Sequence, residues 1–237
     1  MNQTRTLSMY LALSFFAAIL LTLLVLMIPP QTFSLSFLDK VWIATVFILC
    51  CIIGISFTIH PNWIRRYFPK IKNEEKNTRS SKERSFRGHH PDCLTYQNHT
   101  IQWNRKVWCA GCLGLLMGLC VSIVLMLLYI LADFQLTKMT SVLLLVLGLS
   151  IVPVLYIEIL YRSRYAIVHV FINSLMPVCF FIITIAVGEI TGEFIYGLFS
   201  ILLCFLWLDT RIQLSKSHHR SLCRNCVESC KMFTVSI

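Results

Sequence analysis

The sequence predicts an all-α membrane protein, a polytopic bundle of about six transmembrane helices with both termini in the cytoplasm. Three observations support this fold class. Of the 237 residues, 57% are hydrophobic and only 14% are charged, which is more apolar content than one soluble core of this length can bury. The apolar residues gather in six runs, and the basic residues lie almost entirely between alternate runs.

Each of the first five runs is long enough to cross the hydrocarbon core, which takes about 20 apolar residues in a helix. The sixth is only about 15 residues long and would cross fully only if its helix began near Ile190. The first run is longer than the apolar part of a signal peptide and no small-residue cleavage site follows it, so we expect a retained helix. The runs are residues 7–28, 38–59, 112–131, 139–161, 166–187 and 194–208.

The basic residues predict the orientation in the cell membrane. If the N-terminus is cytoplasmic, all but two of the 21 Lys and Arg residues fall in cytoplasmic segments, the exceptions being Lys40 and Lys138. An even number of spans returns the basic C-terminal segment to the same side. The net charge of +10 therefore follows membrane topology, with the lipid bilayer as partner, and not a nucleic-acid surface.

The predicted spans divide the chain into four parts. Residues 1–61 form a two-helix N-terminal membrane hairpin, and residues 62–112 form a cytoplasmic basic linker followed by a Cys/His element. Residues 113–208 form a four-helix membrane bundle, and residues 209–237 form a cytoplasmic Cys/His-rich tail. We expect a flexible linker, because the segment is charged and poor in apolar residues.

The Cys/His element predicts a metal site at the start of the third span. Cys109 and Cys112 form a Cys-x-x-Cys turn, which can present two thiolates to one tetrahedral ion, and Gly111 permits a tight turn between them. Cys93 is the expected third ligand. The candidates for the fourth ligand are His89, His90 and His99.

The C-terminal tail repeats the same pattern, a histidine pair ahead of a Cys-x-x-Cys with a third cysteine close behind. It would supply a Cys₃His set. The tail therefore predicts either a second metal site or additional ligands for the first. Its candidate ligands are His218, His219, Cys223, Cys226 and Cys230.

Zinc is the expected cofactor because the pattern mixes imidazole with thiolate, and histidine is rare in ordinary iron–sulfur clusters. Two alternatives stay open. A Cys-x-x-Cys at a helix start can be a redox pair, and it can also be two idle thiols. The cysteines inside the apolar runs are expected to be plain packing residues.

Two glycines on the third span predict close helix packing. Gly114 and Gly118 lie four residues apart, a spacing of small residues that lets another helix backbone approach. The partner helix could belong to the same chain or to a second copy in a homo-oligomer.

Three polar residues lie within the fourth and fifth spans. Glu158 is about one turn from the cytoplasmic end of its span, while His169 and Asn173 share one face of the next. Ionisable groups at membrane depth are often functional. The alternative is that Glu158 reaches the interface and pairs with Arg162 or Arg164.

No sequence motif assigns a reaction. No nucleotide-binding loop, serine nucleophile motif or His-Glu-x-x-His occurs, so the sequence favours a non-enzymatic role and leaves the question of an enzyme open. Glu189 and Glu193 are expected to be solvated in a short outer loop.

The pattern of histidines and cysteines before the Cys-Ala-Gly-Cys-x-Gly segment resembles a family of uncharacterised prokaryotic polytopic membrane proteins, in which a Cys/His element precedes a CAxCxG motif at the head of a transmembrane helix. Gly111 stands where that family usually has arginine. The resemblance implies a membrane protein with a cytoplasmic Cys/His element, and it does not supply an activity. The matching residues are Cys93, Cys109, Cys112, Gly114 and Gly118, with one upstream histidine.

Three functions follow as hypotheses. The first is an integral membrane protein with a structural zinc site on its cytoplasmic face. The second is a membrane thiol oxidoreductase that uses Cys109 and Cys112, with the tail cysteines as a relay. The third is a transporter or sensor of a metal or small solute, with Glu158, His169 and Asn173 leading inward.

Overall fold

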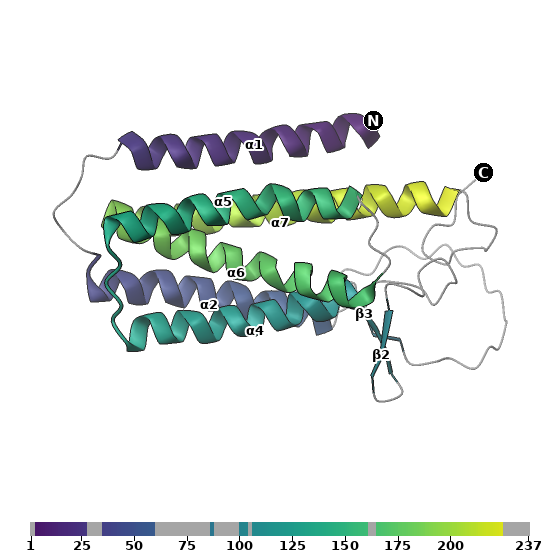
Figure 1. Cartoon of the computed structure of the whole chain (residues 1–237), viewed down its shortest axis with the longest axis horizontal. Helices are drawn as coiled ribbons and strands as arrows, with labels where there is room; N and C mark the ends of the chain where they lie inside the picture. Colours follow the sequence, from purple (N-terminus) through teal and green to yellow (C-terminus); the bar gives the residue numbers. More distant parts are fainter. Residues whose placement is uncertain are drawn as a thin grey trace, which may run out of the picture.

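The computed structural model describes residues 3–27, 35–59, 86–87, 100–103, 106–160 and 165–224. Their dominant elements are six helices, all long and apolar enough to cross a membrane (Figure 1). This confirms the predicted all-α six-span bundle. The helices are α1 (Gln3–Met27), α2 (Phe37–Ile59), α4 (Ala110–Leu131), α5 (Lys138–Leu160), α6 (Ala166–Thr191) and α7 (Phe194–Arg224).

Helix α6 is the centre of the bundle. It packs against α4, α5 and α7, and it buries a larger share of its apolar window than any other of the six helices. The first two helices lie on different sides of this centre: α1 packs on α7, and α2 packs mainly on α4 (Figure 1). The two N-terminal helices are thus neighbours in sequence but not a packed pair.

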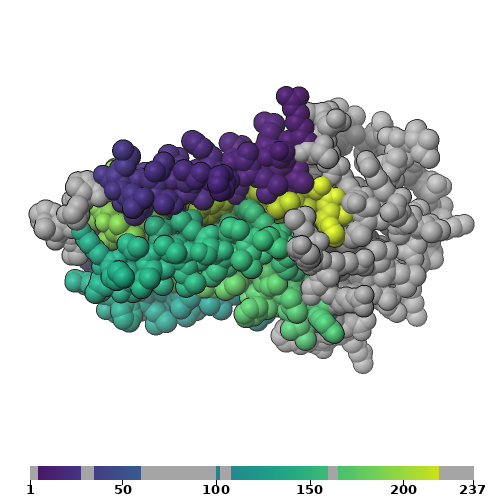
Figure 2. Space-filling view, turned by 45° about the horizontal axis from the view of Figure 1, so that its top comes forward, coloured from purple at the N-terminus to yellow at the C-terminus, as the bar shows by residue number. Residues whose placement is uncertain are grey.

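The outer surface of the bundle is apolar along its length. Large side chains such as Phe15, Phe16, Leu128 and Leu202 are more than half exposed. Figure 2 shows α1 lying along one side of the bundle, with the beginning of α1 close to the C-terminal part of α7. Apolar side chains that face outward on helices of this length are suited to lipid, so the chain is a multi-pass integral membrane protein.

The beginning of α1 and the end of α7 define one end of the bundle. Helix α1 begins and α7 ends at the same end of the bundle (Figure 1), as an even number of spans requires. The starts of α4 and α6 and the end of α5 lie there too. We call this end the termini end, and the other, which carries the α4–α5 and α6–α7 connections, the opposite end.

Helix α7 is longer than its apolar run. Its candidate span covers 25 residues, Phe194–His218, so the shortest predicted span is long enough to cross in full. The helix continues past Leu208 because Thr210, Arg211 and Leu214 bury their side chains in the bundle. The first part of the predicted tail is therefore a helical extension of the last span.

A small sheet precedes α4, and the sequence did not predict it. Its strands are β1 (Phe86–Arg87), β2 (Thr100–Trp103) and β3 (Lys106–Cys109), in the order β1-β3-β2. Strands β2 and β3 are antiparallel, with Thr100 opposite Cys109. Strand β3 runs directly into α4, so the sheet is joined rigidly to the start of a membrane helix.

The Gly114 and Gly118 face of α4 packs against α6 of the same chain. A Cβ atom at Gly114 would lie 2.3 Å from the Val170 carbonyl oxygen, and one at Gly118 would lie 2.3 Å from that of Ser174. This is the within-chain alternative, and it leaves no room for a second helix on this face. A homo-oligomer stays a prediction.

Candidate functional site

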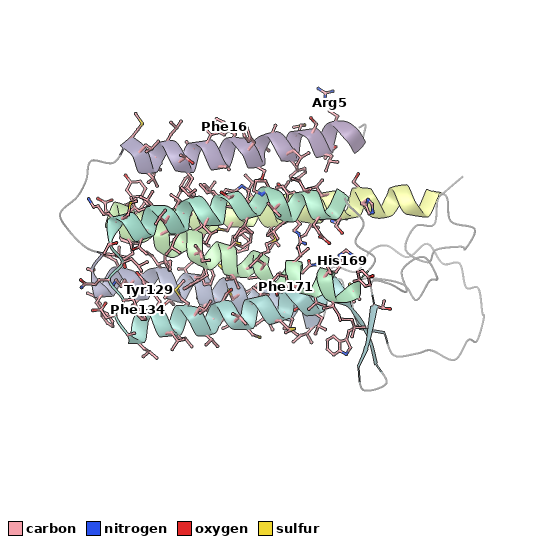
Figure 3. The ribbon with its side chains drawn as sticks, in the orientation of Figure 1. Arg5, Phe16, Tyr129, Phe134, His169 and Phe171 are labelled. Carbon is pink, nitrogen blue, oxygen red and sulfur yellow. The ribbon has the colours of Figure 1, made fainter. Side chains whose placement is uncertain are left out.

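A cluster of four polar side chains lies between α5, α6 and α7, close to the termini end. The members are Glu158 on α5, His169 and Asn173 on α6, and Arg211 on α7. His169 Nδ1 lies 2.7 Å from Glu158 Oε1, and Arg211 Nη2 lies 3.9 Å from Glu158 Oε2. Figure 3 shows His169 near the starts of α4 and α6. We call these four residues the polar cluster.

Arg211 is the centre of the polar cluster. It is only 8% exposed, and its Nη1 donates a hydrogen bond of 2.6 Å to Asn173 Oδ1 and contacts Met176 Sδ at 3.6 Å. Asn173 Nδ2 in turn donates to the backbone carbonyl of His169. A buried guanidinium needs both a counter-charge and acceptors, and here Glu158 and Asn173 supply them from two different helices.

The polar cluster is not fully satisfied. Within the described part of the chain, Arg211 Nε and Glu158 Oε1 are buried without a hydrogen bond of good geometry, although the carboxylate lies within ion-pair distance of the His169 ring. Incompletely paired buried charges in a membrane helix bundle are costly and often belong to functional sites.

The sequence identified three of the four members of the polar cluster. His169 and Asn173 share a face, as predicted, and Glu158 meets His169 there. Arg162 and Arg164, the alternative partners of Glu158, lie outside the described residues. Arg211 was missed because it was assigned to the tail. Its position one helical turn after the buried Trp207 is the signal that could have placed it in the bundle.

The cysteine pair lies beside the polar cluster. Cys109 ends β3 and occupies the N-cap position of α4, and Cys112 lies in the first turn. Cys109 is 3% exposed and Cys112 is half-buried. Between them, Gly111 faces Asn173, with 3.8 Å between a Cβ built on the glycine and the Asn173 amide. The pair is thus at the head of the third span, where the sequence placed it.

Most of the other predicted metal ligands cannot be placed. His89, His90, Cys93, His99, Cys226 and Cys230 lie outside the described residues, and His219 and Cys223 lie in α7 at positions where only the backbone is described. His218 is also on α7. Among the side chains that the structure describes, no three of His, Cys, Asp and Glu are grouped to hold a metal ion.

The cysteines within the spans are packing residues, as expected. Cys51, Cys179 and Cys204 are buried, Cys50 is half-buried and Cys120 is exposed on the lipid-facing side of α4. Cys51 and Cys204 belong to the apolar core of the bundle, and Cys50 packs against it.

A second polar group lies at the opposite end of the bundle. The Lys40 side chain is 1% exposed, and its Nζ lies 3.1 Å from Asp133 Oδ1 and 3.4 Å from Glu189 Oε1. It also donates to the Phe134 carbonyl at 2.8 Å, and Tyr129 donates to the Glu189 carboxylate. Figure 3 labels Tyr129 and Phe134 at this end.

The prediction that Glu189 is solvated is wrong. Glu189 lies in the last turn of α6, is 7% exposed, and neutralises Lys40 of α2. Glu193 is exposed, as predicted. Sequence reasoning missed the buried pair because Lys40 and Glu189 are far apart in the chain and each is close to the end of an apolar run, where a solvated charge is the usual outcome.

A third set of polar contacts attaches α1 to the bundle. Trp207 Nε1 donates to the Ser14 carbonyl at 3.0 Å, and the Tyr156 hydroxyl donates to the Trp207 carbonyl at 2.9 Å. The Ser14 hydroxyl, 3.0 Å from that of Tyr156, is therefore the donor in this contact, because a tyrosine has only one proton to give. These bonds join α1, α5 and α7.

Two chemistries are thus adjacent at the termini end: a pair of thiols at a helix start, and a buried carboxylate, imidazole and guanidinium. The thiols suit a soft or borderline metal ion. The guanidinium already neutralises Glu158, which makes the polar cluster itself a poor cation site. Comparisons with protein families, with curated proteins and with solved structures find no match to this chain.

Proposed function

We propose that this integral membrane protein holds a structural zinc ion at its termini end, with Cys109 and Cys112 as two of the ligands. The observation that carries the proposal is the position of both thiols in the single turn that joins β3 to α4. Side chains three residues apart at a helix start have Cβ atoms about 5–6 Å apart. A tetrahedral zinc with bonds of about 2.3 Å needs sulfurs about 3.8 Å apart, which this turn can supply by side-chain rotation.

The remaining ligands would come from the segment that precedes the cysteine turn in the sequence and from the C-terminal segment. Cys93 with His89, His90 or His99 precedes strands β2 and β3 in the sequence. The end of α7 and the residues after it contain the tail set of His218, His219, Cys223, Cys226 and Cys230. Both segments leave the bundle at the termini end. Zinc would tie the strand–helix junction to one or both of them, and its binding energy would order segments that have little core of their own.

The charge distribution supports a cytoplasmic location for the proposed zinc site. With the termini end inside the cell, Lys40 and Lys138 are the two basic residues on the outer side, in accord with the positive-inside rule. The resemblance to membrane proteins with a Cys/His element and a CAxCxG motif agrees with this arrangement. The resemblance stays a prediction, and it supplies no activity.

The polar cluster argues against a metal path through the bundle. A divalent cation that moved from the cysteines past His169 and Asn173 would meet the buried Arg211 guanidinium, which repels it in a medium of low dielectric constant. The geometry therefore favours a structural metal site over metal transport.

Metal analysis of the purified protein tests the proposal. We expect zinc in the wild type and its loss in Cys109→Ser and in Cys112→Ser. Cys120→Ser is the matched control, because Cys120 is a lipid-facing thiol on the same helix. A Cys109→Ser protein with the zinc content of Cys120→Ser would overturn the proposal. Cys226→Ser tests the tail, since loss of part of the zinc would indicate a second site.

Thiol labelling distinguishes the redox alternative from the zinc site. If zinc protects the cysteine pair, a chelator alone makes Cys109 and Cys112 reactive. If the pair is a disulfide, only a reductant does so, and a thiol oxidoreductase becomes the better assignment.

A further inference from the structure

We propose that the polar cluster couples the metal occupancy of the cysteine turn to the packing of α5 and α7. The inference rests on the proposed zinc site and concerns what binding at that site changes in the membrane. It follows from an uninterrupted series of contacts that begins at Gly111 and ends at His169, and every one of these contacts lies in the described part of the chain.

The first contact joins the cysteine turn to α6. Gly111, between the two cysteines, faces the Asn173 amide, and Gly114 packs so closely that its Cβ would lie 2.8 Å from Asn173 Cβ. No side chain intervenes at either point. A change in the first turn of α4 therefore acts directly on the position of Asn173.

The second contact joins α6 to α7. Asn173 Oδ1 accepts the 2.6 Å hydrogen bond from Arg211 Nη1. The other acceptors near this guanidinium are weaker: Met176 Sδ at 3.6 Å and Glu158 Oε2 at 3.9 Å. Because Arg211 is buried, displacement of the Asn173 amide leaves a charged donor without its best acceptor, which a low-dielectric site does not tolerate.

The third contact joins α7 to α5. Glu158 carries the counter-charge of Arg211 and also lies 2.7 Å from His169 Nδ1. When Arg211 loses the Asn173 bond, the closest remaining charged partner is Glu158. The two contacts use different oxygens of one carboxylate, so movement of that carboxylate toward Arg211 changes its distance to His169. One displacement at α4 thus changes interactions on three further helices.

Two packing states follow. With zinc bound, the start of α4 is fixed, Asn173 bonds Arg211, and Glu158 pairs with His169. Without zinc, the first turn of α4 loosens, Asn173 moves with it, and Arg211 and Glu158 rearrange. The protein would then report the metal at its termini end through the packing of α5 and α7.

Hydrogen exchange of the zinc-loaded and chelator-treated full-length protein tests this. In the wild type we expect faster exchange after zinc removal in residues 110–118, and also in 152–160 of α5 and 207–214 of α7. The expected increase is about tenfold at the distant segments, the change that loss of a hydrogen bond to a charged group produces. If zinc removal speeds exchange only in residues 110–118, the coupling is refuted and the proposed zinc site is still supported.

The Asn173→Ala variant separates zinc binding from the response of α5 and α7. It should keep its zinc and the response of residues 110–118, and lose the response of α5 and α7. Ser174→Ala is the control, because the Ser174 hydroxyl bonds the Phe171 carbonyl within α6, and it should respond as the wild type does. An Asn173→Ala protein with the full distant response would also overturn the inference. If Asn173→Ala does not fold, the wild-type comparison still decides, and a wild type without zinc overturns both proposals.

Discussion

Replacement of Gly118 by alanine should push α4 and α6 apart. The added Cβ would lie 2.3 Å from the Ser174 carbonyl oxygen and 2.8 Å from Ser174 Cα. Ordinary contact begins at 3.4 Å, so the helices must separate by about 1 Å, and backbone atoms cannot yield as a flexible side chain does. Overpacking of this kind typically costs about 1–3 kcal/mol, or roughly a 5- to 150-fold loss in the ratio of folded to unfolded protein.

Gly54→Ala is the matched control for Gly118→Ala. Gly54 of α2 also faces α4, but its Cβ would lie 3.1 Å from Leu119 Cδ1, the far end of a side chain that can turn away. Equilibrium unfolding of both variants in mixed detergent micelles gives the two free energies. Gly118→Ala should be the less stable by at least about 1 kcal/mol. Equal stability of the two variants would show that α4 and α6 are not held together at Gly118 as described.

Two further predictions concern buried polar contacts. Lys40→Met should destabilise the protein by about 3–5 kcal/mol because Glu189 is left charged and buried. The double variant with Glu189→Gln should regain much of this stability. If the losses of the two single variants simply add in detergent unfolding, the two residues do not act as a pair. Trp207→Phe loses the bond to the Ser14 carbonyl and also leaves a cavity at a buried position, so it should cost more than about 1 kcal/mol in the same assay. The lipid-exposed Trp42→Phe should cost much less, and equal losses would contradict the attachment of α1 through Trp207.

The sequence predicted the number and order of the spans because insertion into lipid depends on local composition. The last span shows where this reasoning fails. Its apolar run ends at Leu208, yet α7 continues to Arg224, because Thr210 and Arg211 bury their side chains against neighbouring helices. A scan along one helix cannot detect partners that other helices supply.

The candidate site divides in the same way. The positions of Cys109 and Cys112 at a helix start, and of His169 and Asn173 on one face, follow from spacing alone. Arg211 could not be placed beside Glu158 from spacing, because that contact depends on how α7 is rotated against α5 and α6. The remaining predicted metal ligands lie in segments rich in polar residues, where periodicity gives no guide to position.

By itself, then, the sequence determined a membrane protein of six helices with thiols at the head of the third, since hydropathy and short-range spacing are properties of single segments. Only the tertiary structure decided which charges are buried together. The pairs Lys40 with Glu189 and Arg211 with Glu158 join helices that are distant in the chain. Lipid and protein interior are similarly apolar, so hydropathy does not mark the face that a helix turns inward. That face is marked by close packing at glycines and by the pairing of buried charges.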